Sequence, residues 1–239
     1  MKNITPYSNN KNKKKQIKKM FDNIAQTYDL LNCVLSLRMD YFWRKSVINN
    51  IKNNPKSILD IATGTADIAI SASKIKNAKI IGIDISPKML EIGNKKIKER
   101  NLTERITLEL ADAEVLPYKS NSFQAITSGF GVRNFENMQV GLNEIYRVLE
   151  NDGTLIILEP STPTSFPFKH IYKLYFSYFL PFIGKLISKD KSAYKYLTQS
   201  VNAFPKKSKF IKVLEKIGFK NCKHKSLTFG VASLFIAKK

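Results

Sequence analysis

Residues 57–67 read Ser-Ile-Leu-Asp-Ile-Ala-Thr-Gly-Thr-Ala-Asp, and this stretch decides the fold. Ile58, Leu59 and Ile61 are β-favouring residues of the kind that form a buried parallel strand. The small residues 62–66 form a turn that a ligand can approach closely, and the N–H groups of the next helix point at it. The stretch therefore predicts a strand, a nucleotide-binding turn and a helix.

A second acid stands where a nucleotide site needs one. Asp84 closes the apolar run 79–84, about 20 residues beyond the turn, where a carboxylate can accept hydrogen bonds from both ribose hydroxyls. Asp60 precedes the turn, and a phosphate-binding loop would disfavour that negative charge. The pattern indicates a cationic nucleoside without phosphate, of which S-adenosylmethionine is the common example.

Further motifs resemble those of a known family. They read D-I-A-T-G-T-A-D at 60–67, G-I-D-I-S-P-K-M-L at 82–90, A-D-A-E-V-L-P-Y at 111–118, F-G-V-R-N-F at 130–135 and Y-R-V-L-E-N-D-G at 146–153, with flanking segments at 20–32 and 192–197. In this order they resemble class I methyltransferases, and among these the quinone-ring C-methyltransferases of menaquinone and ubiquinone biosynthesis. The resemblance covers nearly the whole chain.

The resemblance implies a Rossmann-like α/β fold with a seven-stranded, mostly parallel sheet and helices on both faces. We expect a disordered basic tail over 1–12 and a single methyltransferase domain over 13–239. Within that domain, 13–54 would form an N-terminal helical cover, and 160–203 an aromatic insertion on the substrate side. Apolar periodicity also predicts a helix capped by Asp40, a turn over 151–153 and a fifth strand over 154–159.

The expected cofactor, S-adenosylmethionine, would be bound by residues that follow the strands. The resemblance implies this set: Asp60, Gly64, Thr65, Asp67, Asp84, Ile85, Asp112, Ala113 and Gly129. Asp112 and the Ala113 N–H can recognise the edge of an adenine, although an acid at 112 could instead only cap the following turn. Some relatives carry serine where this chain has Gly129.

The resemblance implies C-methylation of a polyprenylated quinol. An aromatic carbon is a poor nucleophile until a neighbouring hydroxyl loses its proton, so the site must favour a phenolate. Arg133 is the candidate for stabilising that charge, Asn134 for orienting a ring oxygen, and Asp29 or a water for accepting the proton. Tyr28 and Tyr194 join Arg133 and Asn134 as candidate substrate contacts.

The segment 20–32 looks closer to the menaquinone branch, which favours demethylmenaquinol as substrate. The ubiquinol precursor, 2-methoxy-6-polyprenyl-1,4-benzoquinol, stays an alternative. A nucleic-acid methyltransferase is the more distant one, and no nucleic acid is expected as partner. Base N-methyltransferases usually carry Asp/Asn-Pro-Pro-aromatic after the fourth strand, whereas residues 128–131 read Ser-Gly-Phe-Gly.

The composition leaves several partners open. The formal net charge is +21, which fits a codon bias towards lysine, attraction to an anionic membrane or, last, a nucleic acid. Two cysteines and two histidines without ligand spacing give no metal site. The oligomeric state cannot be read from the sequence.

An aromatic, proline-punctuated stretch at 166–187 suits a cover that admits an apolar substrate or rests on a bilayer interface. Its apolar run 174–183 is too short to span a membrane, and residues 1–19 do not resemble a signal peptide. We therefore expect a cytoplasmic protein that makes transient contact with the anionic inner face of the membrane.

Overall fold

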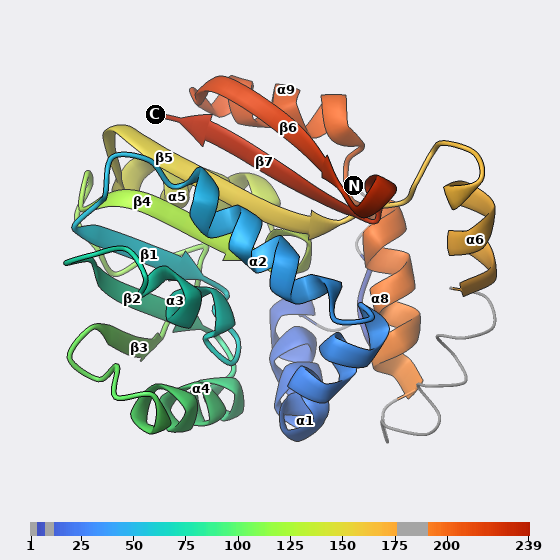
Figure 1. Ribbon diagram of the computed structural model, residues 1–239, viewed down its shortest axis with the longest axis horizontal. Helices are drawn as coiled ribbons and strands as arrows, with labels where there is room; N and C mark the ends of the chain where they lie inside the picture. Colours follow the sequence, from blue (N-terminus) through green and yellow to red (C-terminus); the bar gives the residue numbers. More distant parts are fainter. Residues whose placement is uncertain (1–3, 8–11, 176–190) are drawn as a thin grey trace.

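The computed structural model describes residues 4–7, 12–175 and 191–239, apart from the side chains of Lys191 and Tyr194. Helices and strands alternate along the chain (Figure 1). The elements are α1 (Lys13–Leu35), α2 (Met39–Asn50), β1 (Ser57–Ile61), α3 (Asp67–Ala72), β2 (Lys79–Asp84), α4 (Pro87–Glu99), β3 (Ile106–Leu110), β4 (Phe123–Gly129), η1 (Val132–Asn134), α5 (Met138–Val148), β5 (Leu149–Pro160), α6 (Phe168–Leu174), α8 (Lys191–Ala203), α9 (Lys207–Ile217), β6 (Lys220–Leu227), η3 (Thr228–Gly230) and β7 (Ala232–Lys238).

The strands form one sheet in the order β3-β2-β1-β4-β5-β7-β6. The first five strands pair in parallel, with Leu59 of β1 opposite Ile81 of β2 and Ile126 of β4. β7 runs antiparallel to both β5 and β6. This sheet confirms the predicted seven-stranded, mostly parallel architecture.

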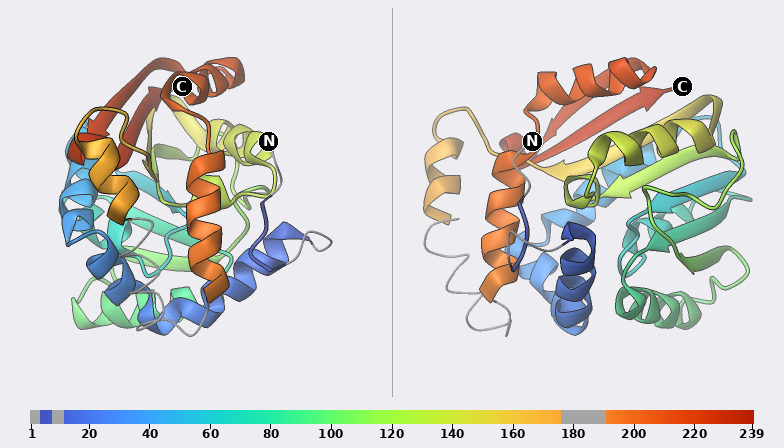
Figure 2. Two further views of the ribbon diagram at one scale, coloured as in Figure 1. Left: turned by 90° about the vertical axis from the view of Figure 1, so that its right-hand side faces the viewer. Right: turned by 180° about the vertical axis from the view of Figure 1, so that it is seen from behind.

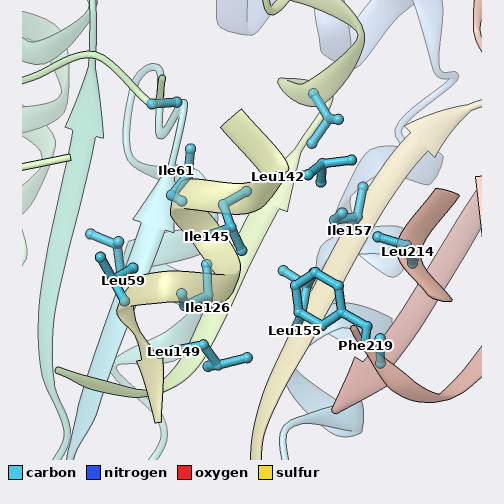
Figure 3. Packing of buried hydrophobic residues seen from close by; sticks show 14 of the residues in the cluster. Leu59, Ile61, Ile126, Leu142, Ile145, Leu149, Leu155, Ile157, Leu214 and Phe219 are labelled. Carbon is cyan, nitrogen blue, oxygen red and sulfur yellow. The ribbon is translucent and has the colours of Figure 1, made fainter. Parts of the chain in front are cut away.

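Different helices cover the two faces of the sheet, because successive strand residues point to opposite sides. Leu59 and Ile61 pack with Leu142 and Ile145 of α5, and α9 extends this layer over β5 and β7 (Figure 3). Ile58 points the other way, into a cluster with α3 and α4. α2 packs beside them over β5 and β7. The outcome is three layers with the sheet in the middle.

A group of helices stands beyond the carboxyl ends of the parallel strands. α1, α6 and α8 lie together there, at the right of the view in Figure 1 and facing the viewer in the left panel of Figure 2. Ile17 and Met20 of α1 pack with Ala193 and Tyr196 of α8. Ligands of open α/β sheets bind at this edge, so these helices cover the expected site.

Two local predictions are wrong. Asp40 does not cap α2, because Leu37 and Arg38 take left-handed backbone (φ 50° and 63°) and α2 begins at Met39. Asp40 sits inside the first turn, where Arg44 pairs with it at 2.6 Å. The turn over 151–153 does not precede β5 but lies within it, at a register irregularity between the pairs Phe123↔Leu149 and Ala125↔Thr154.

Part of the expected disordered tail lies against α1. The backbone N–H of Tyr7 donates to Gln16 Oε1 at 2.9 Å, and Ile4 packs with the cluster around Ile17 and Met20. Asn12 caps α1 by accepting from the Lys15 N–H at 3.1 Å. Apolar contact and a helix cap thus hold residues 4–7 and 12. Residues 1–3 and 8–11 of that tail lie outside the described part.

Within the described ranges, no helix combines the length and the apolar character that crossing a bilayer would require.

Candidate active site

A first cavity, of about 60 Å³, opens at the carboxyl ends of β1, β2, β3 and β4; we call it the cofactor cavity. Six of the nine predicted cofactor residues line it: Gly64, Asp84, Ile85, Asp112, Ala113 and Gly129. They converge because parallel strands end at the same edge of the sheet. Lys14, Ile17, Phe21 and Tyr28 of α1 close the cavity from outside.

Two backbone N–H groups fix the orientation of the Asp84 carboxylate in the cofactor cavity. The Gly64 N–H donates to its Oδ2 and the Ser86 N–H to its Oδ1, each at 2.9 Å. Burial raises the pKa of Asp84 to about 6, although these N–H groups favour its ionised form. Each oxygen keeps further acceptor capacity, so the carboxylate can accept hydrogen bonds from two ribose hydroxyls.

Asp60 supports the turn from behind rather than lining the cavity. Its carboxylate accepts from the hydroxyls of Thr63 and Thr127, each at 2.6 Å, and burial raises the pKa of Asp60 to about 6. Ala62 and Gly64 take left-handed backbone, with φ 54° and 55°. The carboxylate therefore fixes a strained turn whose small residues leave room for a nucleoside.

Thr65 and Asp67, the remaining predicted cofactor residues, gather around Lys96 together with Asp29, the candidate base. The Lys96 ammonium lies 2.9 Å from Asp29 and 3.1 Å from the Thr65 hydroxyl, and it also pairs with Asp67. Thr65 donates to Asp29 at 2.6 Å. None of the three lines either cavity described here. The cluster ties α1 to the turn and to α4, and it places Asp29 away from a reacting ring.

Asp112 caps the following turn and also lines the cofactor cavity. Its Oδ1 accepts from the Glu114 N–H at 2.9 Å, which caps the turn, and its Oδ2 pairs with Lys14 of α1. Asp112 and Ala113 both line the cofactor cavity, as adenine recognition requires. A bound adenine amino group would compete with the ammonium of Lys14 for this carboxylate.

A second, larger cavity of about 340 Å³ lies between α1, α2, α6, α8, the end of β5 and η3; we call it the apolar cavity. Its walls carry Met20, Ile24, Leu31, Trp43, Phe168, Ile171 and Leu197. Four residues line both cavities: Phe21, Tyr28, Phe130 and Asn134. The two cavities therefore adjoin at these four side chains.

Arg133 and Asn134 bring a guanidinium and a carboxamide to the wall of the apolar cavity. The Arg133 guanidinium pairs with Glu159 at 2.9 Å and also donates to the Phe130 carbonyl. Asn134 donates to that carbonyl at 3.0 Å and accepts from the Tyr196 hydroxyl at 3.1 Å. The Arg133 guanidinium and the Asn134 carboxamide are thus held at the wall of a cavity that is mostly apolar but also carries Asn32, Ser36, Asp40 and Thr228.

Several site residues were not predicted from the sequence. Phe21 and Phe130 belong to the shared wall, Tyr196 holds Asn134, and Glu159 holds Arg133. Phe21, Phe130 and Tyr196 stand inside the motifs at 20–32, 130–135 and 192–197, and Glu159 only ends the strand predicted over 154–159. The side chain of Tyr194, a predicted substrate contact, lies outside the described part of the chain.

A family model and curated proteins match this chain over nearly its full length. The model of the ubiE/COQ5 methyltransferase family matches residues 9–239. A demethylmenaquinone methyltransferase from Bacteroides fragilis is 44% identical over 238 residues, which cover 99% of this chain and 97% of that protein. The ubiquinone/menaquinone biosynthesis C-methyltransferase UbiE of Geotalea daltonii is 44% identical over 230 residues, covering 95% and 97%.

Solved structures share the fold at lower identity. A putative S-adenosyl-L-methionine-dependent methyltransferase from Methanococcus maripaludis matches with a TM-score of 0.64 and 24% identity, over 97% of this chain and 96% of that one. Phosphoethanolamine N-methyltransferase 2 of Haemonchus contortus matches with a TM-score of 0.68 and 13% identity, over 95% and 59%. These likenesses support the fold.

Proposed function

The chain belongs to the ubiE/COQ5 methyltransferase family, and on that premise we propose that it transfers a methyl group from S-adenosylmethionine to a ring carbon of demethylmenaquinol. One observation carries the proposal: the cofactor cavity and the apolar cavity share a wall to which Asn134 belongs, and the neighbouring Arg133 lines the apolar cavity. The relatives from Bacteroides fragilis and Porphyromonas gingivalis, which are named for demethylmenaquinone, support that substrate over the ubiquinol precursor.

The polar groups that line the cofactor cavity match the ribose and adenine of S-adenosylmethionine. When bound, this cofactor supplies a methyl group that leaves its sulfur without the bonding electron pair, so a nucleophilic carbon can take it. Asp84 would hold the ribose, while Asp112 and the Ala113 N–H would hold the adenine. Tyr28 and Phe130, which belong to the shared wall, would shield the sulfonium from bulk water and still let the substrate approach it from the apolar cavity.

The apolar cavity fits a quinol ring with the start of an apolar tail. The Arg133 guanidinium stabilises the negative charge on the ring oxygen as its proton leaves, and that charge makes the neighbouring carbon nucleophilic. Asn134 orients the ring, so that its nucleophilic carbon lies in line with the methyl group and the sulfur. We assign the phenolic proton, and later the proton of the methylated carbon, to water, because the Asp29 carboxylate is occupied by Lys96 and Thr65.

The purified chain tests this function directly. We expect methyl transfer from labelled S-adenosylmethionine to a short-tailed demethylmenaquinol kept reduced, and none to the oxidised quinone, because only the quinol can become a phenolate. The ubiquinol precursor is the comparison substrate. Exclusive methylation of that precursor would move the assignment to the ubiquinone branch, and methylation of neither would refute quinol chemistry.

We also propose that the chain meets its substrate at an anionic membrane surface. An exposed apolar face surrounds the apolar cavity, formed by Leu37, Tyr41, Phe42, Phe166, Ile171, Leu174 and Phe229. Exposed cations accompany it at 38, 45, 169 and 173, whereas the only acid within 36–45 and 160–175 is buried Asp40. Part of the aromatic stretch first expected to make this contact, 176–190, lies outside the described residues.

Replacing both Phe166 and Leu174 with serine is expected to weaken binding to anionic vesicles about tenfold, because exposed apolar side chains lose their burial in the bilayer. Neither residue lines the apolar cavity, so activity on a short-tailed quinol should persist. The control replaces Val115 and Val140, which are exposed elsewhere. Absence of wild-type sedimentation with anionic vesicles at low salt would refute the membrane contact.

Replacing Lys14 with alanine is expected to tighten cofactor binding about twofold to fivefold, because the partly exposed pair with Asp112 no longer competes with adenine. Added salt should tighten binding to the wild type and leave the variant unchanged. Titration calorimetry measures both, with exposed Lys15 replaced as the control. Weaker binding in the Lys14 variant would mean that this lysine contacts the cofactor instead.

A further inference from the structure

Glu159, at the end of β5, contacts Arg133 at two separate points. Its Oε1 accepts from the Arg133 backbone N–H at 3.2 Å, and its Oε2 accepts from Nη1 at 2.9 Å. The Glu159 side chain is 0% exposed and that of Arg133 is 9% exposed. One buried carboxylate therefore holds both the backbone and the side chain of a single residue, which fixes the direction of the guanidinium.

The guanidinium keeps unused donor capacity. Nη1 is occupied by Glu159 and the Phe130 carbonyl, whereas Nε is buried and has no hydrogen-bond partner among the described residues. Arg133 lines the apolar cavity. A buried donor without an acceptor is unfavourable, so an oxygen that enters from the cavity would be bound by a prepared partner.

We propose that Glu159 is a positioning residue for methyl transfer, which aims the Arg133 guanidinium at the ring oxygen and offsets part of its charge. Through that offset it sets how acidic the bound ring hydroxyl becomes, with the released proton passing to water. This inference rests on the proposed function, since it names what controls the phenolate there. Neither the sequence motifs nor the family comparison assigns a role to this residue.

Other titratable groups face the same pair. They are Lys13 and Tyr28 from α1 and Tyr196 from α8, and the Lys13 ammonium lies 3.5 Å from the Arg133 carbonyl. A substitution at Glu159 leaves these groups in place. A difference between variants at 159 therefore reports the charge and reach of that side chain.

The Glu159→Gln variant keeps the shape and removes the charge. We expect kcat with a short-tailed demethylmenaquinol to fall about tenfold or more, because a neutral amide holds the guanidinium less firmly than a carboxylate does. We expect the rise of kcat with pH to move to lower pH by about one unit, because the Arg133 charge is no longer offset. The affinity for S-adenosylmethionine should stay at the wild-type value. A pH profile that overlays the wild type after scaling would show a merely structural role and overturn the inference.

The Glu159→Asp variant keeps the buried charge pair and tests the inference even when the glutamine variant does not fold. Its carboxylate, shorter by one methylene, cannot span the backbone N–H and Nη1 together. We expect a loss of kcat without a shifted pH profile, and wild-type kcat in this variant would overturn the positioning role. Glu144→Gln, which removes the charge of the Glu144–Arg147 pair elsewhere, is the matched control and should leave the pH profile unchanged.

A fluorescent phenol, 1-naphthol, separates this inference from the proposed function because it requires no turnover. Its neutral and ionised forms absorb at different wavelengths, so an absorbance titration in the presence of each variant gives the pKa of the bound hydroxyl. We expect a lower pKa in the Glu159→Gln variant than in the wild type, and equal values would overturn the inference. If the pKa falls while the wild type methylates no quinol, the proposed function fails and the charge-setting role of Glu159 stands.

Discussion

Replacing Arg133 with glutamine is expected to lower kcat for demethylmenaquinol about 10²–10³-fold, the range for removing one buried donor that stabilises developing negative charge. The side chain lines the apolar cavity and not the cofactor cavity, so the affinity for S-adenosylmethionine should change little. Single-turnover measurements with saturating cofactor would isolate the chemical step, and titration calorimetry would report cofactor binding.

Stability must be separated from chemistry in this experiment. The Arg133→Gln change leaves the carboxylate of Glu159 buried without its partner, and breaking a buried pair typically costs about 3–5 kcal/mol. Arg105→Gln is the matched control, because Arg105 donates to the carbonyls of Ile75 and Ala78, and none of these three residues lines either cavity. It should lose stability and keep kcat. Equal losses of turnover and cofactor affinity in the Arg133 variant would indicate that the segment 129–134 only shapes the cofactor cavity.

Several strands of the sheet could be predicted from the sequence because β-favouring apolar residues are concentrated in them. Residues 57–61, 79–84 and 106–110 begin and end where the apolar pattern does. The start of α2 could not be predicted, since Leu37 and Arg38 adopt positive φ without the glycine or asparagine that usually marks it. The start of β5 was missed because Asp152, at φ 61°, is accommodated inside the strand as an irregularity.

The cofactor cavity was more predictable than the substrate side. Gly64, Asp84 and Asp112 follow strands, and the sheet topology alone brings their positions together. The partners of Asp29 and Arg133 depend on contacts between elements that are distant in sequence: Lys96 is 67 residues from Asp29, and Glu159 is 26 residues from Arg133. No spacing rule relates such residues, so the ion cluster around Lys96 and the role of Glu159 required the structure.

Replacing Asp84 with alanine is expected to weaken S-adenosylmethionine binding by about 1.5–3 kcal/mol, or about 10- to 150-fold, the scale of hydrogen bonds to a charged group. The change also removes the acceptor for the N–H groups of Gly64 and Ser86. Asp22→Ala is the matched control, because Asp22 accepts from the Ser86 hydroxyl at 2.7 Å and does not line the cofactor cavity. Equal weakening in both variants would assign the effect to loop geometry instead of the ribose contact.

The pH dependence of cofactor binding gives an independent test of Asp84. Burial raises the pKa of Asp84 from 3.8 to about 6, so folding favours the protonated carboxyl. The contribution of this group to the stability of the folded protein is therefore full below pH 3.8 and is lost as the pH rises through about 6. Cofactor binding has the opposite sign, because ribose hydroxyls need the ionised carboxylate as acceptor. Affinity should therefore fall about tenfold for each pH unit below about 6 in the wild type. In the Asp84→Ala variant this part of the dependence should vanish, and a profile that keeps the wild-type slope would remove Asp84 from the cofactor site.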